Sequence, residues 1–167
     1  AAEASGRDVP LMISMTITDM AGRNLSGHTV EGFWHTIRHT KPLTIGLMLA
    51  VMRQIPSVDR EIRNGGWPTP MTYVLRGKTI GLVGLGYVAR HVAKMAKAFE
   101  MEVLAWGPRL TPAIAAAAGA ENCDLDDLIR RSDIVSVHAT LTPQSRGLID
   151  ARRIGLMKPG AYLINTA

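Results

Sequence analysis

The residue types best suited to hold a ligand lie in one glycine-rich stretch, Lys78–Ala89 (KTIGLVGLGYVA). Residues 80–83 are apolar and favour a buried strand, and Gly84 and Gly86 follow it. Glycine here permits a tight turn and lets backbone N–H groups approach a phosphate at the start of the next helix. Ala89 is the third small position, which allows that helix to pack closely on the strand. The stretch predicts a site for the pyrophosphate of a dinucleotide, and the alternative is a strand–helix–strand unit without a ligand.

The surrounding chain predicts an α/β fold. The helix after the glycine turn places a small and apolar face toward a core: Ala89, Val92, Ala93, Ala96 and Phe99. Further strands are expected at residues 102–105, 134–137 and 161–164. Between them we expect helices that begin at Thr111-Pro112, at Asp124 with Leu125, Leu128 and Ile129 facing inward, and at Asp150 with Ile154 and Met157. This alternation is typical of a doubly wound parallel sheet, which binds ligands beyond the carboxyl ends of its strands.

Composition narrows the class of protein. The chain has 167 residues, of which 47% are hydrophobic and 20% charged, as in globular domains. The net charge of +5 is scattered along the sequence, so nucleic acid is not an expected partner. No apolar run reaches the roughly 18 residues that cross a bilayer, and no signal pattern opens the sequence. With Cys123 as its single cysteine, the chain fits a reducing compartment, and we expect the cytoplasm and no membrane partner.

Three segments in a fixed order resemble the D-isomer-specific 2-hydroxyacid dehydrogenases. They are residues 75–86 (LRGKTIGLVGLG), residues 135–138 (VSVH) and residues 157–167 (MKPGAYLINTA). Residues 43–50 (LTIGLMLA) and 62–67 also resemble the helices that lead into the family's cofactor domain. The resemblance therefore covers residues 43 to 167 and implies a Rossmann-like fold.

The resemblance implies hydride transfer between a nicotinamide dinucleotide and a small 2-keto or 2-hydroxy acid. In this family the glycine loop holds the pyrophosphate, and segments after later strands line the cofactor toward its nicotinamide. Carried over residue by residue, the implied cofactor-binding positions are Gly84, Gly86, Tyr87, Val88, His138, Ala139, Thr140, Ser145, Thr166 and Ala167. Each of these positions also has a purely structural interpretation, such as the end of a strand or a contact with solvent.

The choice between NAD and NADP stays open at the second strand end, Trp106-Gly107-Pro108-Arg109. NAD enzymes place an Asp or Glu there, which binds the ribose hydroxyls and repels a 2′-phosphate. Gly107 repels nothing, and the Arg109 guanidinium could pair with the phosphate of NADP. The alternative is that Arg109 is only an exposed loop residue.

The sequence also departs from the family's pattern in its catalytic residues. In the family a substrate-binding arginine directly follows the segment that matches Asn165-Thr166-Ala167, and a carboxylate and an acid/base histidine come later. We therefore expect this chain to contain no catalytic residue, to be a piece of a dehydrogenase and to be inactive alone. The alternatives are a non-catalytic, corepressor-like dinucleotide sensor and an inert fragment.

Residues 1–41 match the family poorly, so we divide the chain into this segment and a nucleotide-binding domain at 42–167, incomplete at its C-terminus. The expected fold is the parallel sheet with an N-terminal helical extension. In a helix, His28, Glu31, His35 and His39 would share a face, but their spacing does not match a zinc motif and no metal is expected. Pro42 predicts a joint at residues 40–42. Leu43, Leu47, Val51 and Ile55 form an apolar face that suits either core packing or an oligomer arm, and we expect a homodimer.

Overall fold

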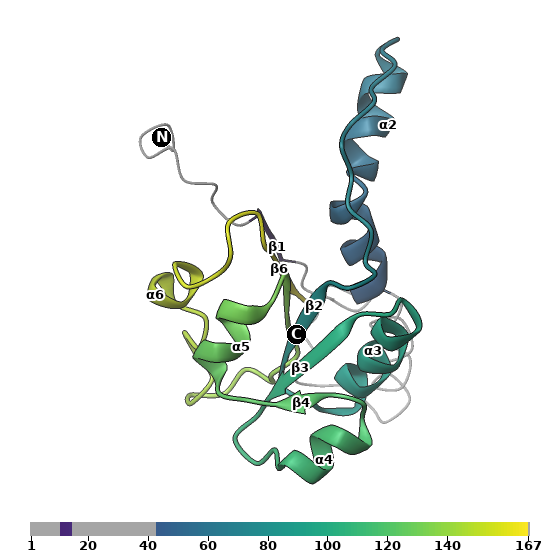
Figure 1. Ribbon diagram of the computed structural model, residues 1–167. Coiled ribbons are helices and arrows are strands. Elements are labelled where there is room, and N and C mark those ends of the chain that lie inside the picture. The colour runs from purple at the N-terminus through teal and green to yellow at the C-terminus, as the bar shows by residue number, and fades with distance from the viewer. Residues whose placement is uncertain (1–10, 15–42, 167) are drawn as a thin grey trace, which may run out of the picture.

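The computed structural model describes residues 11–14 and 43–166 and shows a six-stranded sheet with helices on both faces (Figure 1). All pairings within the sheet are parallel, and the strand order is β1-β6-β5-β2-β3-β4. The strands are β1 (Leu11–Ser14), β2 (Thr79–Val83), β3 (Glu102–Trp106), β4 (Glu121–Asn122), β5 (Ile134–Val137) and β6 (Tyr162–Asn165). The helices are α2 (Ile55–Arg63), α3 (Tyr87–Ala98), α4 (Pro112–Ala117), α5 (Leu125–Arg131) and α6 (Ala151–Ile154), and residues 43–52 are also helical. The predicted doubly wound parallel sheet is confirmed.

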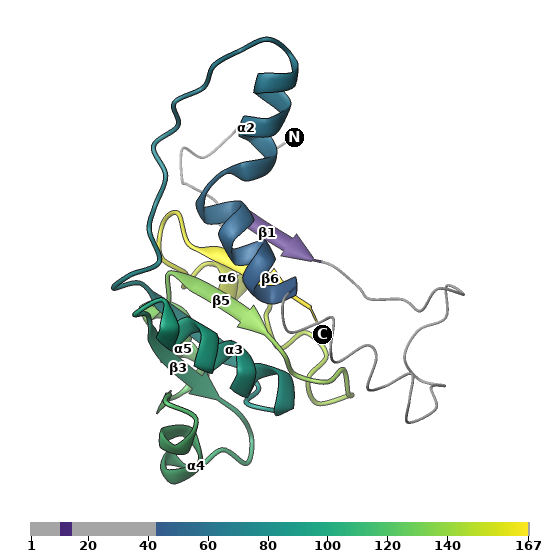
Figure 2. The same ribbon diagram turned by 90° about the vertical axis from the view of Figure 1, so that its right-hand side faces the viewer.

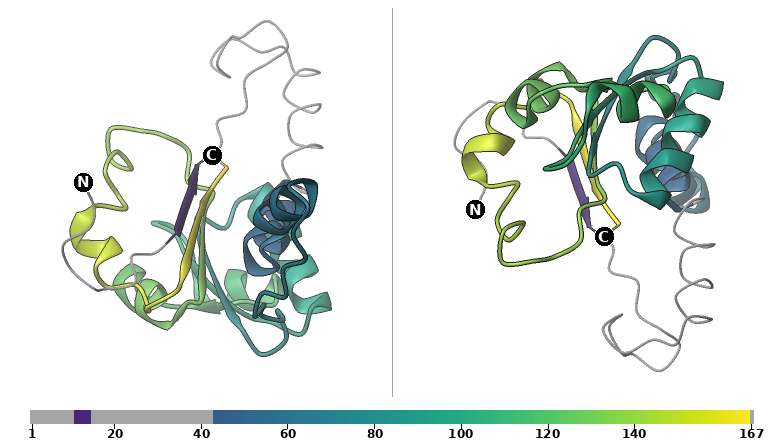
Figure 3. Two further views of the ribbon diagram at one scale, coloured as in Figure 1. Left: turned by 90° about the horizontal axis from the view of Figure 1, so that it is seen from above. Right: turned by 90° about the horizontal axis from the view of Figure 1, so that it is seen from below.

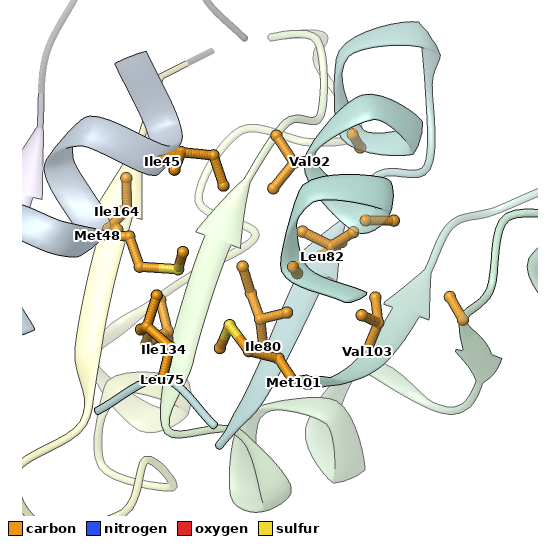
Figure 4. Close-up of a cluster of buried hydrophobic side chains, with 14 of the residues drawn as sticks. Ile45, Met48, Leu75, Ile80, Leu82, Val92, Met101, Val103, Ile134 and Ile164 are labelled. Atoms are coloured by element: carbon orange, nitrogen blue, oxygen red, sulfur yellow. The ribbon is translucent and has the colours of Figure 1, made fainter. Parts of the chain in front are cut away.

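The helices form two layers around the sheet (Figure 3). Helices α3 and α4 and the helical residues 43–52 cover one face, and α5 and α6 cover the other (Figure 2). Side chains alternate between the faces along each strand: in β2, Ile80 and Leu82 join the first core, whereas Val83 joins the second. Figure 4 shows the first core, in which Ile45 from the helical residues 43–52 and Val92 from α3 point toward one another. This burial on both faces explains the nearly continuous apolar strands in the sequence.

The chain reverses its direction of winding at β2. From β2 it passes through α3 to β3 on one side, and it later returns through α5 to β5 on the other side of β2. The carboxyl ends of β2 and β5 therefore flank the point at which a doubly wound sheet opens a crevice. The register aligns the strand ends, because Val83 pairs with both Trp106 and Val137, and Val137 pairs with Asn165.

The helix predicted from Leu43 onward does not continue through Ile55. Gln54 has a left-handed backbone (φ 52°), and a new helix, α2, begins beyond it. Pro56 explains the break, since proline has no N–H to bond the carbonyl oxygen of Met52. That oxygen instead accepts a hydrogen bond from the Tyr73 N–H at 3.3 Å. Of the predicted apolar face, Val51 is buried, whereas Ile55 is exposed.

Several local predictions need correction. Phe99 lies just beyond α3 and is exposed, so it does not extend the buried face. Asp124 precedes α5 without a side-chain capping bond, and Met157 is buried but lies beyond the short α6. The two-residue strand β4 and the strand β1 were not predicted. Residues 11–14 pair with β6, which follows them by about 150 residues in the chain, so no local pattern points to β1.

Candidate functional site

Three of the predicted positions lie side by side at the carboxyl edge of the sheet. Gly84, His138 and Thr166 each follow the last residue of a strand, in β2, β5 and β6. The ladder continues for one residue beyond the strands, because the Gly84 N–H donates to the Trp106 oxygen (2.8 Å) and the His138 N–H donates to the Val83 oxygen (2.9 Å). The structure therefore places Gly84, His138 and Thr166 at one edge of the sheet, although they lie in distant parts of the sequence.

The two glycines of the turn differ in what surrounds them. Gly84 has a φ of +96°, and a Cβ atom there would lie 3.0 Å from the Ala139 nitrogen. Gly84 is thus required by backbone conformation and by the segment packed against it. Gly86 has an ordinary φ of −81°, and a Cβ atom there would have no neighbour within 4 Å. The space beside Gly86 is open, as a ligand approaching the backbone would require.

Helix α3 begins at this open space. Its first intrahelical hydrogen bond runs from the Arg90 N–H to the Gly86 oxygen at 3.1 Å. The amides of Val88 and Ala89 lie in the first turn, where N–H groups have no intrahelical acceptor and the helix dipole is positive. The Tyr87 ring contacts the His91 ring, with ring centroids 4.7 Å apart. This helix end can accommodate an anionic group such as a diphosphate.

His138 and Thr166 are each bonded to a buried hydroxyl. His138 Nε2 lies 2.9 Å from Ser136 Oγ, two residues earlier on the same face of β5. Thr166 Oγ1 lies 3.1 Å from Thr44 Oγ1, which belongs to the helix of residues 43–52. Neither Ser136 nor Thr44 was predicted. The spacing of Ser136 and His138 was visible in the sequence, whereas no local pattern joins Thr44 to Thr166.

Burial lowers the pKa of His138 to about 4. The unfolded chain takes up a proton near pH 6.5, but the folded chain stays neutral there, so protons favour the unfolded state between pH 6.5 and 4. We expect the free energy of unfolding to fall as the pH drops through this window, with a contribution from His138 of up to about 1.4 kcal/mol per pH unit. Urea unfolding at several pH values should give a flatter profile for His138→Gln. Equal slopes for the variant and the wild type would contradict this prediction.

The irregular segment after β5 carries the predicted positions Ala139, Thr140 and Ser145. The Ser145 hydroxyl donates to the Thr140 oxygen at 2.6 Å, and the Thr142 N–H donates to Ser145 Oγ at 2.7 Å. Ser145 therefore holds the bend of its own segment, whereas the structural alternative considered for it was a loop contact with solvent. Ala167 lies outside the described residues, as do Pro42 and the cluster His28, Glu31, His35 and His39.

A pocket of about 480 Å³ adjoins the carboxyl end of β3. Trp106 at the end of that strand forms one side, the start of α5 a second, and Leu148 with Arg153 a third. Gly107 and the exposed Arg109 follow Trp106, so Arg109 lies at the same edge of the sheet but is not part of the pocket lining. Nothing in the sequence pointed to this pocket, because its walls come from separate segments.

Two negative observations apply to residues 11–14 and 43–166. In these ranges no helix has both the length and the apolar character needed to span a membrane. Nor does the described part of the chain group three or more His, Cys, Asp or Glu side chains in a way that could hold a metal ion.

Residues 45–167 match the family model described as D-isomer specific 2-hydroxyacid dehydrogenase, NAD binding domain. D-3-phosphoglycerate dehydrogenase of Mycobacterium tuberculosis is 41% identical over 126 residues, which are 74% of this chain and 24% of that protein. Glyoxylate reductase of Thermofilum pendens is 42% identical over 131 residues, covering 74% of this chain and 39% of the reductase. The chain thus spans about a quarter of the first of these relatives and about two-fifths of the second.

Solved structures agree with the sequence matches. A glyoxylate reductase from Paecilomyes thermophila has a TM-score of 0.72 and 31% identity, with 79% of this chain and 40% of that chain covered. The D-isomer specific 2-hydroxyacid dehydrogenase from Lactobacillus delbrueckii subspecies bulgaricus, in its NAD-complexed form, has a TM-score of 0.69 and 25% identity. That comparison covers 77% of this chain and 40% of the Lactobacillus chain.

Proposed function

Because this chain belongs to the D-isomer-specific 2-hydroxyacid dehydrogenases, through the NAD-binding domain of that family, we propose that it holds the nicotinamide coenzyme of an oxidoreductase. The observation that carries the proposal is the open space beside Gly86, at the positive end of α3 and between the carboxyl ends of β2 and β5. A diphosphate placed there would accept hydrogen bonds from backbone amides and gain from the helix dipole.

The remaining predicted positions extend from this point along the carboxyl edge. We assign Gly84, Gly86, Tyr87 and Val88 to the diphosphate, and the strand ends at His138 and Thr166 to the nicotinamide half. Ala139, Thr140, Ser145 and Ala167 complete the proposed set. When bound, the coenzyme supplies the hydride. The chain's own residues orient the coenzyme. Gly84 permits the close turn. His138, which is bonded to Ser136 and neutral, borders the proposed nicotinamide site without adding positive charge there.

The activity of the whole protein follows as a proposal, since the chain spans only part of its relatives. Its substrate class would be a small 2-keto or 2-hydroxy acid. Such a reaction needs a cation to fix the substrate carboxylate and an acid to protonate the developing alkoxide, and we assign neither role to a residue of this chain. We therefore expect the 167-residue polypeptide to bind coenzyme without turnover. The division into residues 1–41 and 42–167, and the cytoplasmic location, are proposals of the same kind.

Calorimetry on the 167-residue chain tests the proposed function directly. Titration with NADH and with NADPH should give saturable binding of at least one of them, with one site per chain. A chain that is folded by circular dichroism but binds neither would sink the proposal and favour an inert fragment. The other alternative, a non-catalytic sensor, predicts a change of oligomeric state or partner binding on saturation with coenzyme.

Replacing Gly107 with aspartate should favour NAD over NADP. A Cβ atom at Gly107 would meet only Leu110 Cβ at 3.5 Å, an ordinary contact, so the side chain fits without strain. Its carboxylate would accept bonds from the ribose hydroxyls and repel a 2′-phosphate. We expect the ratio of NADH to NADPH affinity to rise about tenfold, which corresponds to about 1.4 kcal/mol. Arg109→Ala should weaken NADPH alone; unchanged affinities for both variants would refute the assignment.

We further propose that the chain forms a homodimer through the arm, defined as α2 and the segment to Val74. The arm projects from the sheet (Figures 1 and 2), and α2 buries no residue. Large apolar side chains are exposed along its whole length: Ile55, Ile62, Trp67, Met71, Tyr73 and Val74. Trp67 and Met71 are 85% and 82% exposed, and such exposure of large apolar side chains supports the proposal of an interface.

Trp67→Ser should raise the dimer dissociation constant about thirtyfold or more, the effect of a buried aromatic anchor worth about 2 kcal/mol. Sedimentation over a range of protein concentrations measures it. Phe99→Ser is the matched control, because Phe99 is also an exposed aromatic residue but lies outside the arm. A monomeric wild-type chain, or equal effects of the two substitutions, would exclude the arm as the interface.

A further inference from the structure

The segment between β5 and α6 contains four of the proposed coenzyme positions but has no regular secondary structure. Ordering such a segment costs backbone entropy at every residue, so specific contacts must offset this cost. Some contacts are local, such as the bond from the Ser145 hydroxyl to the Thr140 oxygen. Local contacts fix the bend but not its position relative to the helices beside it.

Arg153 supplies a connection between the segment and the helices. Its Nε donates to Asp126 Oδ1 on α5 at 2.9 Å, and its Nη1 donates to the Leu148 carbonyl oxygen at 2.8 Å. The Leu148 N–H in turn donates to the Ser145 oxygen at 3.1 Å. The guanidinium of Arg153, on α6, thus connects α5 to residues 145–148 of the segment.

The neighbouring Arg152 provides a natural comparison. Its guanidinium also binds Asp126, at 2.8 Å and 3.1 Å, but these are the only bonds from its side chain that the described residues show. The Arg152 side chain is 55% exposed, whereas that of Arg153 is 24% exposed. Hydrogen bonds from Arg152, and to a smaller extent from Arg153, hold the pKa of the Asp126 carboxyl well below its usual range. Asp126 is therefore ionised at neutral pH.

The Arg153 contacts also form a wall of the pocket beside β3. Asp126, Leu148 and Arg153 all line this pocket, together with Trp106 at the strand end. A shift of Leu148 would therefore alter both the pocket and the segment that carries Thr140 and Ser145. Because proteins hold such contacts to within fractions of an ångström, loss of one anchor changes the site beyond the anchor itself.

We propose that Arg153 is a positioning residue for the coenzyme: by joining Asp126 to the Leu148 carbonyl, it holds the segment after β5 against the site without contacting the coenzyme's reacting atoms. The inference rests on the proposed coenzyme binding. Its distinguishing claim is that the effect requires the bond to Leu148, which Arg153 makes and Arg152 does not.

The experiment compares Arg153→Met with Arg152→Met in the full 167-residue chain. Both variants remove one guanidinium from Asp126, but only the first removes the donor to Leu148. For Arg153→Met we expect about tenfold weaker NADH binding by calorimetry and about tenfold faster amide hydrogen exchange at Leu148. Arg152→Met should change either quantity less than twofold. Arg153→Lys should give intermediate values, because its ammonium lacks the planar fork that serves two partners at once.

Equal NADH affinity for Arg153→Met and the wild type would overturn the inference, and so would equal losses for the two methionine variants. If the wild type binds neither NADH nor NADPH, the proposed function fails instead. In that case the exchange rate at Leu148 still decides whether Arg153 holds the segment. A melting temperature that falls equally in both methionine variants would indicate ordinary ion-pair loss and would not account for a difference in NADH affinity.

Discussion

Replacing Gly86 with aspartate should abolish dinucleotide binding and leave the fold intact. Gly86 is the residue before the first turn of α3, where aspartate is a favoured helix-capping residue, and its backbone conformation suits any side chain. The new carboxylate would accept the N–H groups that the diphosphate needs and would repel its charge. We expect at least a hundredfold loss of NADH affinity, or about 2.7 kcal/mol, by calorimetry. The free energy of unfolding should stay unchanged or rise by about 0.3 kcal/mol.

Two further substitutions separate the role of the charge from that of the turn. Gly86→Ala adds a methyl group to open space, so it should weaken binding only in part and leave stability unchanged. Gly84→Ala places a side chain in the left-handed region and 3.0 Å from the Ala139 nitrogen. Its main effect should therefore be a lower free energy of unfolding. Undiminished NADH binding by Gly86→Asp would remove the basis of the proposed site.

Gly81→Ala should lower the free energy of unfolding more than Gly84→Ala or Gly86→Ala does. Gly81 lies in the central strand β2 on the face covered by α5, and an added Cβ atom would come closer than 3.0 Å to both Ser132 Oγ and Leu128 Cδ2. Ser132 Oγ donates to the Leu128 oxygen at 2.6 Å, so it has little freedom to move. Overpacking of this kind costs about 1–3 kcal/mol, and we expect the upper end of that range in urea unfolding.

Gly46→Ala is the matched control for this prediction. Gly46 lies on the exposed side of the helical residues 43–52, and an added Cβ atom would have no neighbour within 4 Å. Alanine should therefore raise the free energy of unfolding by about 0.5–1 kcal/mol, through helix propensity and a less flexible unfolded chain. If Gly81→Ala proved as stable as the wild type, α5 could not be packed on β2 as closely as the structure shows.

The coarse fold and the glycine turn could be predicted because both depend on short-range patterns. Buried parallel strands must be apolar on both faces, which makes residues 80–83 and 134–137 recognisable in the sequence. Helix capping is equally local. The Thr111 hydroxyl accepts a hydrogen bond from the Ile114 N–H, and the Asp150 carboxylate accepts one from the backbone N–H of Arg153. The order of these elements, with the motifs they carry, was enough to indicate the family.

The sequence alone thus determined that a glycine-rich turn opens a helix within a parallel α/β sheet. Tertiary structure decided which glycine faces open space and which is tightly packed, since Gly81, Gly84 and Gly86 are the same residue type but differ in their neighbours and, at Gly84, in a left-handed backbone. It also decided the bond of Thr166 to Thr44, 122 residues away, and the anchoring of Leu148 by Arg153. Contacts between distant segments depend on how whole layers pack, and no local spacing of residue types encodes that geometry.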